Sequence, residues 1–117
     1  MKNAVKAAFG LIALALVLPL SAATETWKNV ALVDTMCAAK AEVKADPDQH
    51  TSRCALQCAE SGFGVLTSDG TFLKLDEAGN EKAVAALKSG KKTDHLRVTV
   101  SGERDGDTIK VQSLSLD

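Results

Sequence analysis

The chain has 117 residues, of which 25% are charged and 3% aromatic, and its formal net charge is −1. Two of the 14 basic residues and none of the 15 acidic ones fall in residues 1–23, so the remainder has a net charge near −3. Phosphate backbones attract strongly basic surfaces, and single-stranded bases stack on aromatic rings. This composition therefore argues against a nucleic-acid partner.

Residues 1–23 have the pattern of an export signal. Two lysines precede the apolar run 7–20, and small residues then lead to a predicted cleavage after Ala23. The apolar run is short for a membrane span. We therefore expect one mature domain, 24–117, that is periplasmic or secreted and does not stay at the membrane once the signal is removed.

The first half of the mature chain predicts one strand and a helical insertion. The β-prone segment 27–34 is the strand, and the insertion covers about 36–62. Within it, the alanine- and lysine-rich segment 38–43 predicts a short helix. Segment 54–61 predicts a second helix, because the Thr-Ser pair at 51–52 offers an N-cap.

The second half predicts four strands and one helix. Segments 65–67 and 71–75 flank an Asp-Gly turn and form a hairpin. A helix capped by Asn80 and closed by Gly90 follows. Segments 96–101 and 109–116 alternate apolar and polar residues, which is typical of half-buried strands.

This element order predicts a mainly β fold: an OB-like five-stranded barrel with two short helices. The helical insertion lies between strands 1 and 2, and the other helix between strands 3 and 4. A small open α+β sheet is the alternative, but closure removes exposed sheet edges. Residues 114 and 116 are out of phase with 109 and 111, which predicts a β-bulge near 112–113.

All three cysteines and one of the two histidines lie in the insertion. Cys54 and Cys58 are four residues apart, so a helix places both on one face. A helix continuous from His50 would separate His50 from Cys58 by roughly 12 Å along its axis, too far to share one ion. We therefore expect the helix to begin after His50, with Cys37 as the fourth ligand of a tetrahedral site.

Three thiolates and an imidazole suit zinc or copper(I), and Met36 is a further soft donor nearby. The alternative is a disulfide between Cys37 and either Cys54 or Cys58, which would stabilise a small domain by roughly 2–4 kcal/mol. Redox catalysis is disfavoured because the spacing is not CxxC. Haem attachment is disfavoured because Ala59, not a histidine, follows the last cysteine.

The segments VDTMCAAK, DQHTSRCALQCAESG, SDGTFLKLD and VTVSGERDGDTIKVQSL resemble a family of small secreted bacterial domains. Members of this family share a Cys…His…Cys-x3-Cys pattern on an OB-like barrel. Carried over by position, the resemblance implies a metal-ligand quartet of Cys37, His50, Cys54 and Cys58. It brings no established activity.

These patterns together predict an exported, non-enzymatic protein that binds zinc or copper(I) in a structural or metal-handling role. The carboxylates are scattered over turns and element ends, and no catalytic residue stands out. A metal ion is the expected partner, together with another periplasmic protein. The alternative is a metal-free, disulfide-stapled OB-like module that binds a protein or a small ligand.

Overall fold

The computed structural model describes residues 23–117, so nearly all of the predicted export signal lies outside the described residues. Within 23–117, no helix is long and apolar enough to cross a membrane. The strands are β1 (Thr24–Asp34), β2 (Phe63–Leu66), β3 (Phe72–Leu75), β4 (Arg97–Asp105) and β5 (Thr108–Leu116). The helices are α1 (Thr35–Ala38), α2 (Ala41–Ala45), α3 (Ser52–Gln57) and α4 (Glu77–Ser89), with short 3-10 turns η1 (Pro47–Gln49) and η2 (Ala59–Ser61).

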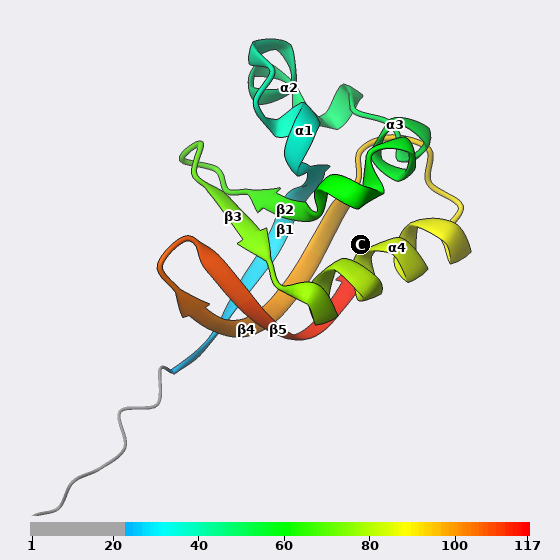
Figure 1. Ribbon diagram of the computed structural model, residues 1–117. Coiled ribbons are helices and arrows are strands. Elements are labelled where there is room, and N and C mark those ends of the chain that lie inside the picture. The colour runs from blue at the N-terminus through cyan, green and yellow to red at the C-terminus, as the bar shows by residue number, and fades with distance from the viewer. Residues whose placement is uncertain (1–22) are drawn as a thin grey trace, which may run out of the picture.

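The five strands form a closed barrel in the order β1-β2-β3-β5-β4, and β4 pairs with β1 to complete the ring. Pairing is antiparallel except between β3 and β5, where Lys74 and Leu75 lie beside Thr108 and Ile109 in parallel. The predicted OB-like barrel is confirmed, and the open α+β sheet is excluded. Figure 1 shows α1, α2 and α3 together at one end of this barrel.

The predicted bulge in the last strand is present. Ser101 lies opposite Ser113, but the next residue, Gly102, lies opposite Val111, so Gln112 is the inserted residue. The extra residue, Gln112, reverses the side of the strand on which the following side chains point. Leu114 and Leu116 therefore pack against the same core as Val111.

The last five residues of β1 are all buried because its two faces meet different cores. Val30 and Leu32 belong to the barrel core, whereas Ala31 and Val33 belong to a second core outside the barrel wall. The second core consists of Ala31, Val33, Cys37, Ala38 and Leu66, with Val43, Cys58 and Phe72 packed against it. Burying a side chain of valine size stabilises by roughly 1.5–3 kcal/mol. The insertion is therefore attached to the barrel by apolar contacts.

Two of the predicted helices differ from the structure in where they break or begin. The single helix expected over 38–43 is wrong, because an extended Lys40 separates α1 from α2. The cap expected at Asn80 is also wrong: α4 begins at Glu77, where the Asp76 side chain accepts a hydrogen bond from the N–H of Gly79. The side-chain oxygen of Asn80 accepts the N–H of Phe63 instead, at 2.8 Å.

The third helix begins where the metal hypothesis requires. Thr51 is its N-cap and accepts the N–H of Cys54, while His50 lies outside the helix in extended backbone. The helix ends earlier than the predicted range of 54–61, because Cys58 leaves helical geometry and a 3-10 turn follows.

Candidate metal centre

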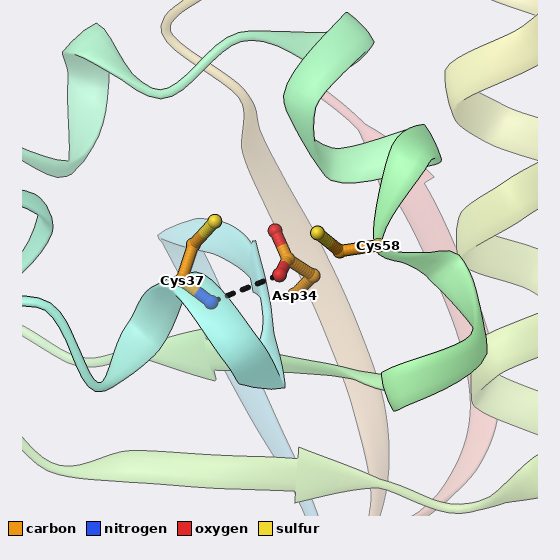
Figure 2. A group of neighbouring side chains, drawn as sticks. All are labelled: Asp34, Cys37 and Cys58. Carbon is orange, nitrogen blue, oxygen red and sulfur yellow. Dashed lines mark hydrogen bonds between the residues drawn. The ribbon is translucent and has the colours of Figure 1, made fainter.

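Three ligand-bearing side chains converge where β1 meets the helical insertion. One ligand atom from each of Asp34, Cys37 and Cys58 lies within 4.8 Å of the other two. Figure 2 shows the Asp34 carboxylate between the two cysteines, with both sulfurs directed toward the same space. The aspartate ends β1, Cys37 is in α1, and Cys58 caps the C-terminus of α3. Residues 24 positions apart are thus brought to one point by the fold.

Asp34 is fully buried and its carboxylate is held on both oxygens. Its Oδ2 accepts the N–H of Cys37 at 2.9 Å, which makes it the N-cap of α1. Its Oδ1 lies 2.8 Å from Nε2 of His50, whose side chain is only 4% exposed. A buried carboxylate is tolerated only when such partners compensate for the water it loses. A carboxylate offers about four lone-pair positions, so these two contacts leave capacity for a cation.

Cys58 reaches the cluster because of how α3 is placed. Its backbone N–H bonds to the carbonyl groups of Cys54 and Ala55, both at 3.3 Å, as the helix tightens toward its end. Ala55, fully buried, packs in the barrel core, while the half-buried Cys58 packs against the second core. The end of α3 is thereby fixed between the two cores, and the sulfur of the C-cap residue Cys58 faces Cys37.

The electrostatic environment of Cys37 favours a positive charge. Burial and the neighbouring Asp34 carboxylate raise the pKa of the Cys37 thiol to about 11, and Cys58 adds to this effect. Without a cation, the thiol therefore keeps its proton at neutral pH. A bound metal ion would replace that proton and offset the negative charge of the carboxylate, since metal ligation requires the thiolate.

The four predicted ligands lie at two neighbouring features, the cluster and a pocket beside it, and Cys37 belongs to both. Cys37 and Cys58 belong to the cluster, and His50 touches the cluster through its bond to Asp34. Cys54 is exposed and lines an adjacent pocket of about 450 Å³, together with Cys37 and His50. All three cysteines are free thiols. The four residues thus lie around one region, and their joint coordination of one ion stays a prediction.

Two other residues with side chains that could bind a metal, Met36 and His95, lie outside the cluster. Met36, beside Cys37, is 63% exposed. His95 is exposed and bonds to the neighbouring Asp94 at 3.0 Å, as a solvated residue would.

Asp34 is the ligand candidate that sequence reasoning missed. Its signal is its position: an acidic residue directly after an apolar strand and three residues before a cysteine. That spacing is typical of a helix N-cap, which explains the bond to the N–H of Cys37 but not the burial. The buried partner of its other oxygen is His50, which is 16 residues away and cannot be paired with Asp34 by local pattern.

The donor set fits a thiophilic cation. Two sulfurs bound to one tetrahedral zinc ion at 2.3 Å lie roughly 3.8 Å apart, and a carboxylate oxygen is a known third donor. The observed convergence within 4.8 Å needs only a small adjustment to meet this geometry. Copper(I) also accepts two thiolates.

Fold and site together define a small OB-like barrel that carries a thiol–carboxylate cluster at one end. Comparison of the chain with protein-family profiles, with curated proteins and with solved structures gave no match.

Proposed function

We propose that this protein is an exported, non-enzymatic metal-binding protein that holds zinc or copper(I) at the end of its barrel. Cys37 and Cys58 are the thiolate ligands and Asp34 is the carboxylate ligand. The observation that supports this most directly is the convergence of these three groups within 4.8 Å. Metal binding would be favourable here because the cluster, once its thiols ionise, carries an excess of buried negative charge that a cation offsets.

The role we propose is to carry or sense the ion, more than to anchor the insertion. The insertion is already attached through the second core, to which α1 contributes Cys37 and Ala38 beside Val33 and Leu66. The insertion therefore does not need the ion in order to stay attached to the barrel. Three protein ligands also leave a fourth coordination position for exchange, whereas structural zinc sites are usually closed by four.

The test is metal binding by the ligand variants. Reduced, metal-free wild-type protein is titrated with zinc, and separately with copper(I), and the stoichiometry is read by native mass spectrometry. We expect one ion per wild-type chain and a loss of at least roughly 100-fold in affinity for Cys37→Ser and Cys58→Ser. His95→Ala, which removes the histidine outside the cluster, is the matched control and should bind as wild type does.

A second candidate function, a disulfide-stapled binding module, rests on the short distance between the sulfurs of Cys37 and Cys58. The sulfurs of Cys37 and Cys58 are close enough that a modest shift would let them form a disulfide, which needs an S–S distance of about 2.05 Å. Such a bond closes a loop of about 22 residues and would stabilise by roughly 3 kcal/mol. The protein would then be a stapled binding module. Thiol titration of freshly purified, non-reduced protein separates the two: one free thiol indicates the disulfide, whereas three after chelation indicate the metal site.

A further inference from the structure

Cys54 is a soft ligand that the thiol–carboxylate cluster does not use. It is exposed on α3, one turn before Cys58. The pocket beside the cluster is lined by Cys54 together with Cys37 and His50, and several of its other lining residues, Lys40, Glu42 and Asp46, are exposed. The wall of the pocket thus includes both solvent-exposed residues and the buried Cys37.

His50 gives this pocket a second ligand with a defined orientation. The residue is only 7% exposed, and its Nε2 is committed to the buried Asp34 carboxylate at 2.8 Å. Nδ1 is therefore the ring nitrogen left for a ligand. Metal-bound histidines commonly donate their other N–H to a carboxylate, which fixes the tautomer and the ring orientation. His50 has this arrangement already.

We infer that the ion reaches and leaves the cluster through a second, outer position, where Cys54, His50 and Cys37 bind it. These three residues line one pocket, but their ligand atoms do not lie within 4.8 Å of one another, so the side chains must move toward the ion to form this position. This inference rests on the proposed function. Cys37 belongs to both positions, because it lines the pocket and is a member of the cluster. The ion moves from the outer to the inner position by keeping its bond to Cys37 while it exchanges Cys54 and His50 for Cys58 and Asp34.

The exchange conserves charge and oxidation state. At each thiol exchange one metal–sulfur bond forms as another breaks; the incoming thiol releases one proton, and the outgoing thiolate takes one up. The same chemistry allows the exposed Cys54 to accept an ion from, or pass it to, a thiolate of a partner protein or a small chelator. No electron donor or acceptor is needed.

The experiment measures the rate of zinc transfer and the affinity separately. Wild-type and variant proteins, each loaded with one equivalent of zinc, are mixed with a chromogenic chelator in a stopped-flow instrument, and affinities come from equilibrium competition. For Cys54→Ser we expect an affinity close to that of wild type and transfer slowed by roughly 10-fold or more. Gln57→Ser, on the same helix and exposed but outside the pocket, is the matched control and should transfer at the wild-type rate.

Each contrary result excludes a different part of the proposal. If wild-type protein binds no zinc, the proposed function fails first. If zinc binds but Cys54→Ser transfers as fast as wild type, the outer position does not exist. If Cys54→Ser loses as much affinity as Cys58→Ser, Cys54 is a permanent ligand of a closed site, and the two-position scheme is overturned. Circular dichroism of each variant confirms that the barrel is folded.

Discussion

Asp34 joins three functions in one side chain. It ends β1, caps α1 through the N–H of Cys37, and holds His50 by its other oxygen. Its negative charge also raises the pKa of the Cys37 thiol. The same residue thus sets the backbone geometry, the histidine orientation and the charge of the cluster.

The charge on Asp34 can be separated from its capping role by Asp34→Asn. An asparagine still accepts the N–H of Cys37, but it lacks the charge that attracts a cation. We expect the free energy of unfolding to fall by about 1–3 kcal/mol, because His50 loses an ionised partner. Zinc affinity should fall as well. Asp76→Asn, at the N-cap of α4, is the matched control. Calorimetric titration that shows equal zinc binding in both variants would contradict this role for Asp34.

The raised pKa of Cys37 predicts an order of thiol reactivity. Only the thiolate reacts with iodoacetamide, and at pH 8 a thiol with a pKa of about 11 is ionised in about one molecule in a thousand. In reduced, metal-free protein we expect Cys54 to be alkylated first and Cys37 last, as read by peptide mass spectrometry. Labelling of Cys37 should accelerate as the pH rises toward 11. Equal rates for Cys37 and Cys54 at pH 8 would disagree with the burial and charge described.

Besides Ala55 of α3, which packs in the barrel core, two further contacts fix the helical insertion to the barrel. The second core holds α1, and an ion pair holds η1: Nε and Nη2 of Arg97, at the start of β4, donate to the two carboxylate oxygens of Asp48 at 2.8 and 3.0 Å. This double hydrogen bond from Arg97 lowers the pKa of Asp48.

The start of α3 after His50 was predictable from the Thr-Ser pair, which is a local signal. The split into α1 and α2 was not predictable, because it occurs at Lys40, whose extended backbone no local sequence signal indicates.

The Asp48–Arg97 pair makes one contribution to stability dependent on pH. Because the pKa of Asp48 is lower in the folded than in the unfolded state, its contribution is present above about pH 4 and is lost as the pH falls through the folded value. The pair is about one third exposed, so the contribution is below about 1 kcal/mol. We expect Asp48→Asn to destabilise the protein at pH 7 and to have less effect near pH 3.

Urea unfolding at several pH values measures this dependence. Asp46→Asn is the control, since the exposed Asp46 makes no side-chain capping bond at η1. A difference between wild type and Asp48→Asn that stays constant from pH 7 to pH 3 would rule out the proposed linkage.

At the scale of the whole molecule, the barrel was the predictable part. Strand alternation, the Asp-Gly pairs at 69–70 and 105–106 and the out-of-phase leucines of β5 are all local, and together they specify five strands and a bulge. The site was predictable only in part. The grouping of all three cysteines in the insertion indicated Cys37, Cys54 and Cys58, of which the cluster contains Cys37 and Cys58. The participation of Asp34 depends on the tertiary fold, which no local pattern contains.

Metal binding should stabilise the entire fold, because the ligands come from both ends of the insertion. A ligand present at 100 times its Kd adds about 2.7 kcal/mol to the free energy of unfolding. For a domain of this size we expect zinc to raise the Tm by about 10–20 °C. The double variant Cys37→Ser/Cys58→Ser should show no zinc-dependent rise in differential scanning calorimetry. An equal rise in that variant would place the ion elsewhere.

X-ray absorption spectroscopy at the zinc edge counts the sulfur atoms around the ion and so shows whether Cys37 and Cys58 bind it. For protein loaded with one equivalent of zinc, we predict two sulfur ligands at about 2.3 Å, completed by oxygen or nitrogen donors. A shell of oxygen and nitrogen alone would contradict the account, since it would show that the converging sulfurs of Cys37 and Cys58 do not hold the metal.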